Sequence, residues 1–245
     1  MIPRIFVLNL ARSRDRRALM ETQAAAHGVT FEFIEGVDVL SLVDQGSYLS
    51  RAEDACLQSH RGIWRRIADE GKPTIVLEDD VTLSADFVGT VEACVRDRST
   101  DDVVLFGHHS TRSDHREGAA VSFWRTRLTA GRSLARVVEF PMGAYAALIM
   151  PGAAARLRRF ADPPRMPADW VTGYSPRVGV RLLGVKPPCV TLAPIGKLST
   201  IDDRGPKAAA AAASRSRLKD LLGPIWLRAR QLGIGPTGYT FKLER

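Results

Sequence analysis

The stretch IVLEDDV, residues 75–81, decides the fold that we expect for this chain. Its apolar, β-branched start predicts a buried strand. Three carboxylates, Glu78, Asp79 and Asp80, follow that strand directly. Because ligands of open α/β sheets bind at the edge where the parallel strands end, these carboxylates are predicted to lie at a ligand-binding edge.

Carboxylate oxygens at such an edge suit Mg²⁺ or Mn²⁺, cations that also accept substrate phosphates as ligands. Adjacent side chains of an extended segment point to opposite faces, so Glu78 and Asp80 should share one face and Asp79 should take the other. We therefore predict Asp80 as the main metal ligand and Glu78 as a second one. Asp79 would bind a substrate hydroxyl or share the metal. A solvated acidic turn is the alternative, which so short a motif does not exclude.

Strands and helices alternate on both sides of this stretch. The predicted elements are a strand over 2–10, a helix over 13–27, a strand over 30–37, a helix over 50–70, the strand over 74–77, a helix over 84–98 and a strand over 103–107. Shorter strands, some of them antiparallel, follow over 119–127, 134–140 and 144–150, before a helix over 152–160. This order predicts a single α/β domain with a mostly parallel sheet flanked by helices.

Composition limits the possible partners. The chain has 245 residues, 45% of them hydrophobic, which suffices for one domain with a sizeable core. A net charge of +8 favours partners that carry phosphate: nucleic acid, an anionic membrane surface or a nucleotide-linked substrate. The sequence contains no helix-turn-helix, RNA-binding aromatic pair or zinc module, so we expect no nucleic-acid partner.

Cysteine usage and the N-terminus predict a cytoplasmic protein. Cys56, Cys94 and Cys189 are odd in number and lie far apart, which predicts reduced thiols and neither a disulfide framework nor a zinc site. The apolar run at the N-terminus is too short for a signal peptide. No stretch approaches the roughly 20 apolar residues of a transmembrane helix.

A composition shift near Gly205 divides the chain into a domain over 1–205 and a basic tail over 206–245. Within the tail, residues 214–232 combine leucines, arginines and Trp226, a pattern typical of a helix on a membrane surface. Pro224 would kink such a helix. The alternatives are peripheral binding to the cytoplasmic membrane face and packing against the domain or a partner subunit.

Four segments, in order, resemble glycosyltransferase family 25, the family of the lipooligosaccharide β-galactosyltransferases. They are VLNLARSRDRR at 7–17, FEFIEGVD at 31–38, CLQSHRGIWRRI at 56–67 and GKPTIVLEDDV at 71–81. Later echoes are GAYAALIMPGAA at 143–154 and PADW at 167–170, so the resemblance covers roughly residues 4–200. The chain departs from the family at Ala55, where a glycine is usual, and over 108–133, which matches no part of the pattern.

The resemblance implies a GT-A-like fold, which is a single nucleotide-binding α/β domain with a metal at its acidic motif. It also implies a UDP-sugar donor, usually UDP-galactose. The segment Leu8, Asn9 and Leu10 would then lie near the base and ribose. Arg14 and Arg17 would reach the donor phosphates or the ribose, because a guanidinium group matches phosphate geometry. The solvated face of a helix is the alternative for these arginines.

Three histidines are further candidates. His60 lies on the same side of its helix as Cys56, and the resemblance favours a contact with the donor near the metal. The alternative is a buried polar pair of His60 and Ser59 satisfied by hydrogen bonds. His108 and His109 follow the strand over 103–107. Since neighbours on a strand face opposite sides, at most one of the two should serve a ligand.

Asp169 is the candidate catalytic base, because an inverting transfer needs a carboxylate to take the proton of the acceptor hydroxyl. Inversion itself is implied by the β-linked products of the family. Asp169 stands beside Trp170, whose indole offers an apolar face to a sugar ring. The alternative for Asp169 is an ordinary helix N-cap.

Together these features predict a metal-dependent inverting glycosyltransferase. It would move a sugar, galactose by the resemblance, from a UDP-sugar to a lipooligosaccharide or another surface glycan. Two alternatives stay open from the sequence: a catalytically degenerate relative that acts as a binding module, and a basic nucleic-acid-binding protein.

Overall fold

The computed structural model describes residues 2–42, 49–110, 114, 116–129 and 131–194, and four further residues, 228, 229, 231 and 232. Of Ala144 only the backbone is described. The predicted boundary at residue 205 and nearly all of the tail over 206–245 lie outside these residues, so both stay predictions.

An eight-stranded sheet in the order β2-β1-β3-β8-β5-β9-β7-β6 forms the centre of the molecule. Its strands are β1 (Arg4–Asn9), β2 (Phe31–Glu35), β3 (Thr74–Glu78), β5 (Asp102–His109), β6 (Val121–Arg127), β7 (Ser133–Val137), β8 (Met142–Ile149) and β9 (Arg181–Lys186). Within this sheet β7 and β8 run against the other six strands, since each pairs antiparallel with both of its neighbours. The prediction of a mostly parallel sheet with antiparallel strands downstream is confirmed.

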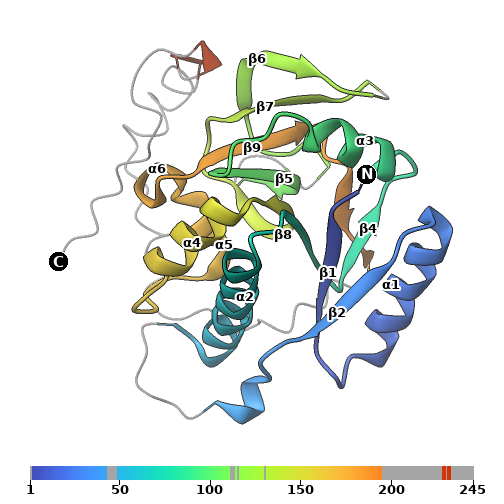
Figure 1. Ribbon diagram of the computed structural model, residues 1–245, viewed down its shortest axis with the longest axis vertical. Helices are drawn as coiled ribbons and strands as arrows, with labels where there is room; N and C mark the ends of the chain where they lie inside the picture. The colour runs from blue at the N-terminus through green and yellow to red at the C-terminus, as the bar shows by residue number, and fades with distance from the viewer. Residues whose placement is uncertain are drawn as a thin grey trace.

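Helices cover both faces of the sheet and make three layers (Figure 1). One face carries α2 (Arg51–Glu70), α4 (Pro151–Phe160), α5 (Ala168–Gly173) and α6 (Ser175–Val178). The other face carries α1 (Arg14–His27), α3 (Phe87–Val95) and a small sheet of β4 (Val81–Leu83) and β10 (Val190–Leu192). A 3-10 helix, η1 (Val39–Ser41), follows β2. The predicted α/β class is confirmed.

Local signals fix the ends of the two longest helices. The Ser50 hydroxyl accepts the backbone N–H of Glu53, and the Glu53 carboxylate accepts the N–H of Ser50, so the predicted capping box starts α2. Gly28 and Gly71 end α1 and α2 at φ 62° and 64°, in the left-handed region that favours glycine. The buried face of α2 repeats at helical spacing and includes Leu57, Ile63, Trp64 and Ile67.

The helix predicted from Ser84 starts later than expected. Residues 81–83 form β4 instead, and its Val81 and Leu83 are buried in the pairing with β10. The Ser84 hydroxyl then donates to the Asp86 carboxylate at 2.6 Å, and α3 begins at Phe87. Three residues are too few to show strand periodicity, and the partner strand lies far downstream in the sequence. For the same reason β10, also of three residues, was not predicted. The six residues of β9 were not predicted either, and this strand pairs with β5 and β7, which lie far upstream.

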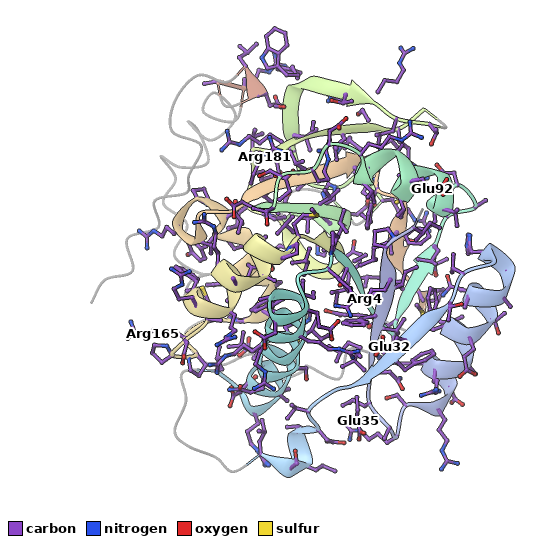
Figure 2. The ribbon with its side chains drawn as sticks, in the orientation of Figure 1. Arg4, Glu32, Glu35, Glu92, Arg165 and Arg181 are labelled. Atoms are coloured by element: carbon purple, nitrogen blue, oxygen red, sulfur yellow. The ribbon has the colours of Figure 1, made fainter. Side chains whose placement is uncertain are left out.

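Buried polar groups in the middle of the sheet have hydrogen-bond partners. Asp102 of β5 is fully buried and accepts two hydrogen bonds of 2.6 Å from Arg181 at the start of β9 (Figure 2). His108, also fully buried, accepts the Ala119 N–H at Nδ1 (2.9 Å) and donates from Nε2 to the Val185 carbonyl (3.0 Å). Both groups therefore act in the fold, because each satisfies its neighbours.

Candidate active site

The ends of β1 and β3 meet at one edge of the sheet, since the strands are parallel neighbours with Leu8 paired to Glu78. The residues that follow this pair, Asn9 after Leu8 and Asp79 after Glu78, are both buried. The Asn9 amide donates to the Asp79 carboxylate at 2.7 Å and to the Ser13 carbonyl at 3.3 Å. Asn9 therefore holds Asp79 in place and ties it to the start of α1.

Arg16 of α1 reaches the acidic motif from the other side. Its guanidinium donates to Asp79 at 2.9 Å and to Asp80 at 3.3 Å. The expected alternation, with Glu78 and Asp80 on one face and Asp79 on the other, is thus wrong. The chain leaves the extended conformation after Glu78 and turns at residues 79–80, so neighbouring carboxylates share one arginine.

Asp80 combines burial with an incomplete set of contacts. Its Oδ1 is buried and has no hydrogen-bond partner among the described residues. Burial, and then the neighbouring Glu78 carboxylate, raises the Asp80 pKa to about 7, against the opposing influence of Arg16. An unsatisfied carboxylate oxygen beside a second carboxylate is an environment that a divalent cation fits.

Glu78 turns away from Arg16 towards α2. One of its carboxylate oxygens lies 3.5 Å from Nε2 of His60, a side chain that is 2% exposed. Cys56 lies one turn earlier on α2, and burial followed by Glu78, Asp169 and Asp80 raises the pKa of its thiol. Cys56 and His60 of α2 therefore lie near the carboxylates of Glu78, Asp80 and Asp169, at the same end of the sheet.

Ser59 of α2 bonds to backbone groups and not to these carboxylates. Its hydroxyl donates to the Ala55 carbonyl at 2.7 Å and accepts the Val37 N–H at 2.8 Å. The alternative of a buried polar pair satisfied by hydrogen bonds therefore holds for Ser59, whereas Nε2 of His60 has no such partner among the described residues.

Asp169 lies in the first turn of α5, where Pro167 and not Asp169 is the N-cap residue. The Asp169 carboxylate accepts the Trp170 N–H at 2.9 Å and, at 3.4 Å, the Gly143 N–H of β8. These contacts place the carboxylate beside β8, the neighbour of β3 in the sheet. The N-cap alternative is thus excluded, while the role of base stays a prediction.

Tyr145 of β8 was not singled out in the sequence. Its hydroxyl is buried without a hydrogen-bond partner among the described residues, and burial, with Glu78 and Asp80, raises its pKa. The Tyr145 ring fills the space beside Gly107 and Gly143, where an added Cβ atom would overlap it. The His109 ring stacks on the Tyr145 ring with 6.2 Å between the ring centres. A tyrosine two residues after a glycine is too common a pattern to have revealed this.

The other predicted donor residues lie along β1 and α1. Leu8 and Leu10 both lie against Gly36, where an added Cβ would meet each side chain at 3.3 Å. Arg14 lines an open hollow of about 240 Å³ formed by residues 12–16. Arg17 pairs with Glu21 at 2.9 Å, and its guanidinium lies 4.1 Å from the centre of the Phe33 ring. Of the arginines on α1, Arg16 is the one seen to bind the acidic motif, and it was not among the predicted site residues.

All three cysteines, Cys56, Cys94 and Cys189, are free thiols. None of the helices in the described part of the chain combines the length and apolar composition needed to cross a bilayer. The cytoplasmic location stays a prediction.

The sequence profile of glycosyltransferase family 25, described as LPS biosynthesis protein, matches residues 2–169. This match covers more than half of the chain and includes Asn9, Arg16, Tyr145, Asp169 and the acidic motif. The chain therefore belongs to glycosyltransferase family 25, and the resemblance stated from the sequence is confirmed.

Individual relatives match shorter segments. The lacto-N-neotetraose biosynthesis glycosyltransferase LgtB of Neisseria meningitidis serogroup B is 35% identical over 89 residues, 31% of this chain and 32% of LgtB. The putative glycosyltransferase R655 of Acanthamoeba polyphaga mimivirus is 35% identical over 98 residues, 34% of this chain and 30% of R655. The aligned segments thus span about a third of these relatives.

Two more distant matches complete the comparison. The probable inactive glycosyltransferase 25 family member 3 of Bos taurus is 25% identical over 152 residues, 49% of this chain and 26% of that protein. A crystal structure of a glycosyltransferase involved in the glycosylation of the major capsid of PBCV-1 aligns with 74% of this chain and 81% of its own, with a TM-score of 0.41 and 12% identity. We draw nothing from so distant a structural likeness.

Proposed function

We propose that this chain is a metal-dependent glycosyltransferase that uses a nucleotide-sugar donor. The observation that carries the proposal is the Asp80 carboxylate, which is largely buried at the ends of β1 and β3 and has an unsatisfied oxygen. Membership in glycosyltransferase family 25 supports the same reaction. Arg16 contacts one oxygen of this carboxylate, whereas the other, Oδ1, is buried without a hydrogen-bond partner among the described residues, and a bound cation would supply one.

Asp80, with Glu78 as a second ligand, would hold Mn²⁺ or Mg²⁺. When bound, such a cation neutralises the charge that develops on the departing nucleotide diphosphate. Arg16 stands beside the same carboxylates, and its guanidinium is within reach of a phosphate that binds there. Asn9 keeps Asp79 fixed, so the acidic motif is held in shape before the donor arrives.

Asp169 would act as the base that takes the proton of the acceptor hydroxyl during an inverting attack on the anomeric carbon. The carboxylate accepts backbone N–H groups of α5 and β8, and these hold it in one orientation. The Tyr145 hydroxyl, buried near Glu78 and Asp80, would donate a hydrogen bond to the donor or the acceptor.

For the substrates we propose UDP-galactose as donor and a lipooligosaccharide or another surface glycan as acceptor. The family and the printed role of LgtB in lacto-N-neotetraose biosynthesis support this choice. Transfer would take place in the cytoplasm, with the basic tail over 206–245 resting on the membrane face where a glycolipid acceptor is exposed.

The test is a thermal-shift screen of UDP, GDP and CMP sugars, each with and without Mn²⁺. A ligand that binds the folded state alone stabilises it by about 2.7 kcal/mol at a hundredfold excess over its dissociation constant. We expect a Mn²⁺-dependent shift with one UDP-sugar and its loss in Asp80→Asn. Glu35→Gln, which changes an exposed carboxylate at the end of β2 (Figure 2), is the matched control and should keep the shift. A shift that survives Asp80→Asn would contradict the metal assignment.

A binding module without catalysis is the second candidate, because the bovine relative is named a probable inactive glycosyltransferase. Both candidates predict donor binding, so turnover separates them. Release of UDP from the shifted donor in the presence of a glycan acceptor would support the enzyme, and donor binding without any release would support the binding module.

A further inference from the structure

We propose that Cys56, His60 and Glu78 form a binding site for a zinc-class cation, distinct from the Mn²⁺ or Mg²⁺ position at Asp80, with which it would share Glu78 alone. Their three ligand atoms, a thiol sulfur, an imidazole nitrogen and a carboxylate oxygen, all lie within 4.8 Å of one another. The three side chains come from the first half of α2 and from the end of β3. Two consecutive elements, joined by the short turn over 71–73, thus present ligands to one point.

His60 is the observation that points to a ligand. Its side chain is 2% exposed, yet Nε2 has no hydrogen-bond partner among the described residues. That nitrogen is directed at the Glu78 carboxylate from 3.5 Å, which is longer than a good hydrogen bond. A buried nitrogen left in this state costs free energy, and a cation between it and the carboxylate would satisfy both groups.

The backbone supports the three ligands firmly. Cys56 and His60 are four residues apart on α2, so both side chains project from the same helix face. The helix is fixed by its capping box and by Trp64, whose ring lies 5.8 Å from the ring of His60. Glu78 is the last residue of β3, and Asp79 and Asp80 after it are held by Arg16. The direction of Glu78 towards α2 therefore comes from the fold.

The ligand set selects the cation. Thiolate and imidazole are soft and borderline ligands that favour Zn²⁺ over Mg²⁺ or Mn²⁺. Zinc binds sulfur at about 2.3 Å and nitrogen or oxygen at about 2.0–2.2 Å, so the ligand atoms of a tetrahedral site lie roughly 3.5 Å apart. The three ligand atoms lie within 4.8 Å of one another, so a bound zinc would draw them closer together.

Binding is balanced by the loss of one proton. The S–H bond of Cys56 breaks, its proton goes to solvent, and a sulfur–zinc bond forms without any change in oxidation state. Three protein ligands leave the fourth tetrahedral position open, as in catalytic zinc sites and unlike structural ones. Asp80 and Asp169 are close enough to Cys56 to raise the pKa of its thiol, so this site would adjoin the proposed donor site.

The experiment uses the full chain, stripped of metal and titrated with Co²⁺ as a coloured substitute for Zn²⁺. We expect a thiolate-to-cobalt absorption band, its displacement by Zn²⁺, and about one zinc per chain by elemental analysis. Cys56→Ser should abolish the band and weaken zinc binding by more than about 100-fold. Cys94→Ala, which changes a buried thiol of α3 on the opposite face of the sheet, is the matched control and should keep both. An unchanged band in Cys56→Ser would overturn the proposal.

A second measurement needs no variant. The alkylation rate of Cys56 in the wild-type chain is followed by peptide mass spectrometry, which separates this thiol from the buried Cys94 and Cys189. Zn²⁺ should slow this alkylation and Mg²⁺ should not. Equal rates with and without Zn²⁺ would also overturn the site.

The two proposals fail separately. Asp80→Asn should lose the Mn²⁺-dependent shift with a UDP-sugar and still bind Co²⁺ with the thiolate band. Loss of that band in Asp80→Asn would show a single shared cation position and overturn the separate zinc site, whatever the result for the donor.

Discussion

Two buried histidines, His60 on α2 and His108 on β5, show how differently this fold treats polar groups in two places. Both are at most 2% exposed. Both ring nitrogens of His108 are used, one by the Ala119 N–H and one by the Val185 carbonyl. Nε2 of His60 has no hydrogen-bond partner in the described part of the chain.

The same contrast separates two regions of the sheet. Around β5 and β9, the buried carboxylate of Asp102 accepts hydrogen bonds from two nitrogens of the Arg181 guanidinium, Nε and Nη2. Around the end of β3, the Asp80 Oδ1 atom and the Tyr145 hydroxyl are buried and, like Nε2 of His60, have no hydrogen-bond partner within the part of the chain that the structure describes. Since unsatisfied buried groups cost stability, their concentration at one sheet edge indicates a place kept for ligands.

Asp169→Asn gives the largest expected effect and tests the candidate active site, one side of this contrast. Transfer should fall by about 10²–10⁴-fold, because the amide cannot take the acceptor proton. The Trp170 and Gly143 N–H groups bond to different oxygens of Asp169, so the single amide oxygen of asparagine keeps one of these bonds, and the fold and the Mn²⁺-dependent donor shift should persist. Steady-state transfer kinetics measure this, with Asp162→Asn, an exposed carboxylate before α5, as the control. A near-normal rate would exclude Asp169 as the base.

His108→Gln gives a smaller effect and tests the other side of the contrast, the region of satisfied polar groups, through the pH dependence of the free energy of unfolding. Burial lowers the pKa of His108 to about 4, below its ordinary 6.5. Between these values the unfolded chain binds the proton and the folded chain does not. The free energy of unfolding should therefore decrease as the pH falls from about 6.5 to 4, by at most about 1.4 kcal/mol per pH unit.

Glutamine offers the same acceptor and donor without titrating, so the His108→Gln variant should lose that part of the pH dependence. Urea unfolding at several pH values compares the two slopes. Identical slopes would mean that His108 does not contribute in this way.

Tyr145→Phe gives the smallest effect on stability and the most informative sign. Removal of an unsatisfied buried hydroxyl should leave the free energy of unfolding unchanged or raise it by up to about 1 kcal/mol. The same change should lower transfer, if the hydroxyl serves the substrates. Thermal unfolding and transfer rates are measured together. The control is Tyr174→Phe, at the end of α5, where the Tyr174 ring packs against Phe140. A destabilised Tyr145→Phe would place this hydroxyl among the satisfied groups of the core.

Local parts of the structure followed from the sequence. The capping box of Ser50 and Glu53, the glycine ends of α1 and α2, and the strand that runs into Glu78 were all predicted, because each depends on neighbours within one helical turn or one strand. The acidic motif at the end of β3 was likewise predicted, since an apolar strand followed by carboxylates places them at the sheet edge.

Only the tertiary structure decided which side chains meet at that edge. Arg16, and not its neighbour Arg17, binds Asp79 and Asp80, because the angle of α1 on the sheet determines which residue faces the motif. Tyr145 enters the site because glycines of two neighbouring strands make room for its ring. The Glu78 side chain, just before the turn, points towards His60 of α2. The strands β4, β9 and β10 form by pairing with strands that are distant in the sequence. A sequence pattern records local propensity, whereas these contacts depend on packing between elements that are far apart in the chain.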